Sequence, residues 1–238
     1  MSNKSTQDGF TIIELMFSMT VFSFLLLAAT AAIIQVGRMY YKGVTITKTQ
    51  NVARQVIDDI SRPIQFSGQS PVINNVGTLF GIAPNQVRVF AVCIGSTRYS
   101  YAVDAQVDST IPAGTYIGAT HKIRHALWRD VLAVAPGVCT PVDLRVANPT
   151  AVGTEMLSEN MRLSRYCVGT PPNNAPACGG GGASGAGLYQ IDVWLVYGDQ
   201  NVLDLTSYPG HTVCQGGFLG TQFCAVSENN TVVTRRLR

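Results

Sequence analysis

Residues 10–36 read FTIIELMFSMTVFSFLLLAATAAIIQV and decide the architecture of this 238-residue chain. The 27 residues of this segment include one charge, Glu14, and neither proline nor glycine. A helix needs about 20 apolar residues to cross the hydrocarbon core of a bilayer. The sequence therefore predicts a membrane-spanning helix over residues 10–36, with a carboxylate near its first turn.

A cleaved secretory signal is the competing interpretation of this segment. Lys4 would supply its basic start, and the ATA at residues 29–31 its cleavage site. The apolar part of such a signal has about 7 to 15 residues and is not normally acidic. Length and the acid both favour the membrane span.

The helix is expected to continue beyond the apolar segment. In residues 37–62 apolar side chains recur at spacings of three and four, which is typical of an amphipathic helix; they are Val52, Val56, Ile57 and Ile60. Pro63 is the expected stop, because proline breaks the helical hydrogen-bond ladder. Gly37 and Gly43 each weaken the middle by about 1 kcal/mol relative to alanine, which predicts a bend or local melting there.

Composition argues against a cytosolic enzyme. Hydrophobic residues make up 46% and charged residues 13% of the chain, against about 25% charged residues in average proteins. Residues 64–238 carry 11 basic and 10 acidic side chains, a balance that argues against nucleic acid as a partner. The terminal cations Arg235, Arg236 and Arg238 are interpreted as a solvated stretch.

The six cysteines predict disulfides in an oxidising compartment. Their number is even, none lies in a CxxC motif, and they allow 15 pairings that sequence alone does not resolve. We favour two short loops and one long one; the pairs are Cys167–Cys178, Cys214–Cys224 and Cys93–Cys139.

Residues 63–238 are expected to form a β-rich head. Apolar and polar residues alternate in four runs, which predicts antiparallel strands with one buried face; the runs are residues 87–94, 98–103, 142–147 and 189–197. Tyr189, Ile191, Val193 and Leu195 would face the core and be covered by the amphipathic part of the helix. The fold class is therefore α+β.

No recognisable catalytic, cofactor or metal site is found, and we expect a protein that is not an enzyme. His121 and His125 have the spacing of two zinc ligands on a helix, but THKIRHALW is better interpreted as a strand. GGGGASGAG lacks the GK[ST] ending of a phosphate loop. It belongs to residues 169–187, which hold seven glycines and three prolines and are expected to form a surface loop of functional importance or disorder.

Glu14 needs an explanation, because a carboxylate in hydrocarbon costs at least about 2.5 kcal/mol. If the chain were cut between Gly9 and Phe10, the new α-amino group would lie one helical turn away. Glu14 of one subunit could then pair with the Phe10 amine of a staggered neighbour. Alternatively, Glu14 extends to the headgroups from the helix end.

The stretch GFTIIELM begins at Gly9, the last residue of a short polar leader that contains Lys4. It resembles the cleavage site of type IV prepilins and type II secretion pseudopilins. The resemblance implies that residues 1–9 are a leader removed after Gly9 by a membrane prepilin peptidase, which also methylates Phe10. It further implies that Glu14 forms an assembly salt bridge. The implied partners are other pilin or pseudopilin subunits, the inner-membrane assembly platform and the cytoplasmic membrane.

Segments of the head are similar in order to the larger minor pilins of the PilW and PulJ kind. The absence of proline and glycine between Phe10 and Val36 differs from many major pilins. The resemblance implies a minor pilin or pseudopilin that initiates or caps a filament, inserted first in the inner membrane with its head outside the cytoplasm. The alternatives are a tip module for adhesion to a cell surface or DNA, a type II secretion pseudopilus component, and an anchored enzyme.

Overall fold

In the computed structural model, the described residues are 11–169, 187–204, 213–215 and 223–235. The chain divides into two compact units, Met1–Tyr41 and Lys42–Arg238. The first unit contributes the apolar part of a long helix, and the second contains the rest of that helix with all the strands. Each unit is described by itself.

Helix α1 comprises Ile12–Phe66. It continues without a break through Gly37 and Gly43, so the helix does not melt at these glycines. The predicted stop at Pro63 was wrong, since α1 extends one turn beyond it. Pro63 has no N–H to donate to the carbonyl oxygen of Asp59. The hydroxyl of Tyr99 donates to that oxygen instead, at 3.0 Å, which compensates for the missing helical bond.

One sheet contains five antiparallel strands in the order β1-β2-β3-β6-β7. Their bounds are Val72–Phe80, Val87–Ile94, Thr97–Tyr101, Leu127–Val131 and Gly153–Glu155. The predicted strand 87–94 is confirmed, and strand 98–103 is present in shorter form. Sequence neighbours β1, β2 and β3 form successive hairpins, while β6 pairs with β3 across 25 intervening residues.

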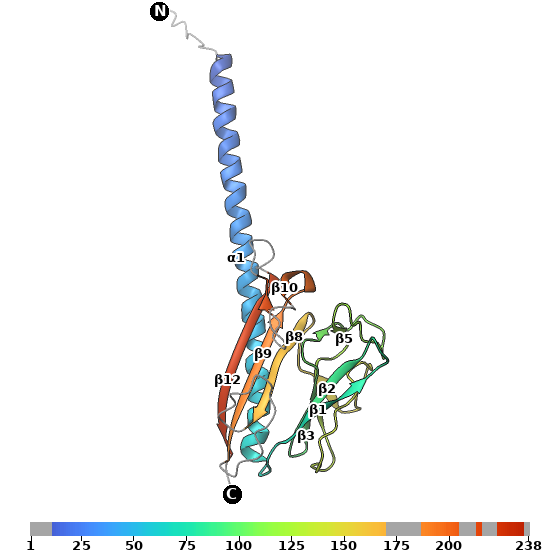
Figure 1. The fold of residues 1–238 in the computed structure, drawn as a ribbon. Coiled ribbons are helices and arrows are strands. Elements are labelled where there is room, and N and C mark those ends of the chain that lie inside the picture. Colours follow the sequence, from blue (N-terminus) through green and yellow to red (C-terminus); the bar gives the residue numbers. More distant parts are fainter. Residues whose placement is uncertain (1–10, 170–186, 205–212, 216–222, 236–238) are drawn as a thin grey trace, which may run out of the picture. The chain divides into compact units, whose positions relative to one another are not determined.

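A second five-stranded sheet has the order β12-β9-β8-β4-β5 (Figure 1). Its strands are Ala225–Thr234, Leu188–Tyr197, Met161–Gly169, Gln106–Val107 and Lys122–Ile123. All pairs are antiparallel except β4 with β5, which is parallel and departs from the expected pattern. A short 3₁₀ helix, Gln200–Val202, leads into a two-stranded ribbon of β10 (Leu203–Asp204) and β11 (Val213–Cys214).

The main core forms where the second half of α1 packs against the strands, as predicted. Val56 and Ile60 are fully buried and Val52 and Ile57 partly so. The four expected core residues of β9 are buried in the same cluster; they are Tyr189, Ile191, Val193 and Leu195. The helix adds three residues that the sequence interpretation did not include; they are Thr49, Ala53 and Ile64.

One predicted strand is wrong, and another is present only in part. Residues 142–147 form turns, because the Asp143 carboxylate accepts a hydrogen bond from the backbone N–H of Arg145 at 3.0 Å. This Asx turn bends the backbone away from extended pairing. THKIRHALW is extended only in the short β5 and at the start of β6, and His121 just before β5 has a positive φ of 52°.

Candidate membrane and assembly site

Of the predicted site residues at the start of the chain, the structure describes Glu14. Gly9 and Phe10 lie outside the described residues. Glu14 occupies the first turn of α1 and is its only acid there. A carboxylate in this position is favoured by the partial positive charge at the N-terminus of a helix.

Thr11 caps the helix that carries Glu14. The backbone N–H of Glu14 lies 3.1 Å from the Thr11 carbonyl oxygen and 3.4 Å from its Oγ1. The N–H of Leu15 bonds to the same carbonyl at 3.2 Å. Thr11 and Glu14 thus have the spacing of a capping box, S/T-x-x-E. This spacing was visible in the sequence and gives Glu14 a local reason to be present, besides assembly.

The apolar side chains of α1 are exposed in the first unit. The helix includes an 18-residue window with a mean hydropathy of 2.2, none of it buried by the protein. Phe17 is 73% exposed and Leu27 68%. By length and composition, this helix is able to cross a membrane. Its apolar surface requires lipid or other protein around it, because contiguous patches of this size are rare on soluble monomers.

The hydroxyl groups along the span are satisfied within the helix. Each donates to a carbonyl three or four residues earlier, at 2.7–3.0 Å; the donors are Ser18, Thr20, Ser23 and Thr30. A polar group without a partner in hydrocarbon would cost several kcal/mol. The span is therefore compatible with lipid on every side, apart from the Glu14 carboxylate and the side-chain amide of Gln35.

Asp59 joins the helix to the first sheet within the second unit. Its carboxylate lies 2.9 Å from the Tyr99 hydroxyl on β3 and 3.0 Å from Nε of Arg129 on β6. Burial and the adjacent Asp59 carboxylate raise the pKa of Tyr99 well above its usual range. Tyr99 therefore stays protonated as a hydrogen-bond donor, and the end of α1 is held on the sheet.

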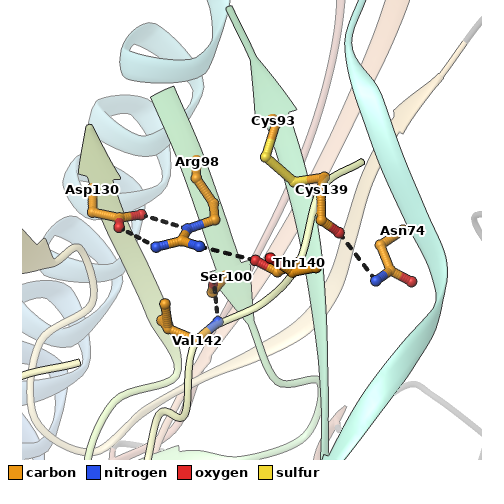
Figure 2. Close-up of a disulfide and its surroundings, with 8 residues drawn as sticks. All are labelled: Asn74, Cys93, Arg98, Ser100, Asp130, Cys139, Thr140 and Val142. Atoms are coloured by element: carbon orange, nitrogen blue, oxygen red, sulfur yellow. Dashed lines mark hydrogen bonds and ion pairs between the residues drawn. A yellow bond between two sulfur atoms is a disulfide. The ribbon is translucent and has the colours of Figure 1, made fainter. Parts of the chain in front are cut away.

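Residues 132–142 form a strap connected to the first sheet (Figure 2). A disulfide joins Cys139 in the strap to Cys93 on β2. The carbonyl oxygens of Cys139 and Thr140 accept hydrogen bonds from Asn74 on β1 and Arg98 on β3, at 3.1 Å each. Arg98 is itself paired with Asp130 on β6 at 3.0 Å. The strap is thus fixed directly to three strands of the sheet, and Asp130 on a fourth strand holds Arg98 in place.

A second disulfide links Cys214 on β11 to Cys224, ahead of β12. Together with Cys93–Cys139 it makes two of the three pairs that we favoured from the sequence. Cys167 is disulfide-bonded, and its proposed partner Cys178 lies outside the described residues. The remainder of the Gly/Pro-rich loop, residues 170–186, also lies outside them.

His121 and His125 are engaged in separate contacts. His121 Nδ1 lies 3.3 Å from the Tyr116 hydroxyl, and burial lowers its pKa with a further contribution from Arg162. His125 lies between the carbonyl oxygen of Ala147, at 3.1 Å, and the Glu155 carboxylate, at 3.4 Å. Within the described residues, no three His, Cys, Asp or Glu side chains form a metal-binding group.

A hollow of about 260 Å³ opens at the end of β9. Its lining contains one carboxylate, Asp199, among amide, aromatic and aliphatic groups; the other residues are Asn160, Tyr197, Gly198, Asn201, Val202 and Phe223. A single acid and a tyrosine, with no histidine, cysteine, serine or lysine in this lining, do not form a recognisable catalytic arrangement.

Residues 4–30 match the family model of the prokaryotic N-terminal methylation motif. The match covers residues 4–9 of the expected leader, Phe10, Glu14 and most of the apolar segment, and it supports a protein of the type IV pilin or pseudopilin kind. No curated protein and no solved structure is significantly similar to the chain. The motif and the exposed apolar helix together fit a membrane-anchored, pilin-like protein with an α+β head.

Proposed function

We propose that this protein is a minor pilin or pseudopilin, a structural subunit that initiates or caps a filament. It is inserted in the inner membrane, cut after Gly9 by a prepilin peptidase and methylated on Phe10. It then joins other pilin subunits through its N-terminal helix at the assembly platform. The observation that carries this proposal is the overlap of the methylation motif with the exposed apolar helix.

The proposed role of the helix is associative. In lipid, its apolar side chains contact hydrocarbon tails, and in a filament they would contact equivalent helices. Little hydrophobic free energy separates the two environments, because lipid tails are as apolar as leucine. The Glu14 carboxylate distinguishes them, since pairing with the Phe10 amine of a neighbour would neutralise it in a single axial stagger. The helix would thus provide cohesion, and Glu14 the register.

Processing is tested by intact mass and N-terminal sequencing of the protein from its native membrane. The expected product starts at methylated Phe10. A Gly9→Val variant, whose side chain is bulkier at the cut, is the matched control and should keep residues 1–9. A native chain that starts at Met1 would contradict the proposal.

Adhesion through the head is the alternative function that the Gly/Pro-rich loop favours. Deletion of residues 171–186 separates the two roles. The deletion leaves Cys167 in place but by itself would remove Cys178, the disulfide partner that we favour for it. A linker that keeps Cys178 is therefore used. Lost cell attachment with a normal number of filaments would favour adhesion, whereas lost filaments would favour assembly.

A further inference from the structure

The helix carries a basic and aromatic segment directly after its apolar span. Arg38, Tyr40, Tyr41 and Lys42 are all exposed, the tyrosines by 68% and 58%. The first helix residue buried by the head is Thr49. We call residues 38–42 the interfacial segment, because it lies between the apolar span and the part of α1 that packs into the core.

The charged residues in this part of the helix are all basic. Between Glu14 and Asp58 the sequence contains four cations and no acid; the cations are Arg38, Lys42, Lys48 and Arg54. Arg38 and Lys42 are four residues apart in the sequence. Like charges at this spacing repel each other in a helix. Neither forms an ion pair with another described residue.

We propose that the interfacial segment binds the anionic headgroups of phospholipids at the membrane boundary on the head side. Tyrosines favour this boundary because their rings are apolar and their hydroxyls polar. Basic side chains are attracted to anionic lipid. The segment follows the apolar span without interruption, so the headgroup layer is the medium that it meets when the span fills the hydrocarbon core.

This placement also sets the depth of Glu14. The 24 residues from Glu14 to Arg38 correspond to about 36 Å of helix, whereas the hydrocarbon core is about 30 Å thick. With Arg38 among the headgroups on one side, Glu14 reaches the headgroups on the other. The carboxylate is then solvated in the membrane and enters an apolar environment only on leaving it. This step rests on membrane insertion of the helix, as in the proposed function, but not on filament assembly.

The test reconstitutes the full chain in phosphatidylcholine vesicles that contain a spin-labelled lipid, either phosphatidylglycerol or phosphatidylcholine. Electron spin resonance then measures how strongly each labelled lipid associates with the protein boundary. We expect a preference for phosphatidylglycerol of about fivefold for each cation, since a basic residue near anionic lipid contributes roughly 1 kcal/mol. The preference should disappear in 1 M salt, where the Debye length is about 3 Å.

Arg38→Gln/Lys42→Gln should remove the preference while leaving the protein resistant to carbonate extraction. Arg54→Gln/Arg62→Gln is the matched control, because it removes the same charge from exposed positions further along α1; it should behave as wild type. Equal association of both lipids with the wild type, or equal loss in both variants, would overturn the lipid site alone. Extraction of the wild type by carbonate would overturn both this inference and the proposed membrane anchor.

Discussion

The Tyr99 hydroxyl lies 3.0 Å from the backbone carbonyl oxygen of Asp59, the group that Pro63 leaves without a helical donor. A side chain of β3 thus replaces a backbone bond of α1. The helix extends past a proline because the sheet supplies the missing hydrogen bond. The same hydroxyl lies 2.9 Å from the Asp59 carboxylate, which ties the two elements together.

Tyr99→Phe should reduce the free energy of unfolding by about 1–2 kcal/mol, because it leaves partly buried acceptors on Asp59 without their donor. Urea unfolding of the full chain in detergent, followed by tryptophan fluorescence, measures the change. Tyr40→Phe removes a hydroxyl from an exposed tyrosine and should have no effect. Equal stability of the two variants would show that the Tyr99 hydroxyl does not support the helix end.

Two substitutions of Glu14 separate its charge from its position in the capping box. Glutamine retains the capping-box residue type but not the charge, whereas alanine retains neither. If the carboxylate pairs with a neighbouring amine, Glu14→Gln and Glu14→Ala should both reduce incorporation into sheared filaments. Both should insert in the membrane as the wild type does. Normal incorporation of Glu14→Gln, with loss for Glu14→Ala, would assign Glu14 to the cap alone.

Removal of the strap disulfide should destabilise the head and release the strap. The Cys93–Cys139 bond spans 46 residues, so by the chain-entropy model Cys93→Ser/Cys139→Ser costs about 4 kcal/mol. Hydrogen exchange at the Val142 N–H, which donates to Ser100 Oγ at 3.2 Å, should become faster. Cys214→Ser/Cys224→Ser is the control for general destabilisation. Unchanged exchange at Val142 in the first variant would contradict the strap.

His121 should make the head less stable in acid. Its folded-state pKa is lowered, chiefly by burial, so below the unfolded value of about 6.5 the unfolded chain binds the proton first. Stability is thus fully present above that pH and is lost below it. His121→Asn suits the positive φ and should flatten the fall of the melting temperature between about pH 7 and 5. An equally steep fall in the variant would assign the acid sensitivity to other groups.

The long helix and the strands of continuous alternation were predictable from the sequence because local pattern determines them. Val56 and Ile60 on α1, and Ile191 and Val193 on β9, follow simple periodicities and are buried as expected. The end of the helix was not predictable, because the donor that permits Pro63 is Tyr99, 36 residues away. Pattern alone does not identify such a distant partner.

The turn at Asp143 was missed for a different reason. Its alternation is that of a strand, but the side chain bonds to its own backbone two residues on. At the candidate site, the charge of Glu14 within an apolar run identifies it in the sequence. Its hydrogen bond with Thr11 follows instead from the rules of helix capping. The registers that place β6 beside β3, and the parallel pair β4–β5, depend on long-range contacts that single-sequence patterns do not encode.

The serine and threonine hydroxyls of the first unit are bonded within α1, so this part of the helix can pass from one apolar environment to another. A segment whose hydroxyls already have partners one turn away carries the same set of hydrogen bonds into any apolar surroundings. Exchange of fatty acyl chains for protein neighbours would break none of those bonds. Within residues 12–36, sensitivity to the change of medium is therefore concentrated near the two ends, in the Glu14 carboxylate and the Gln35 amide.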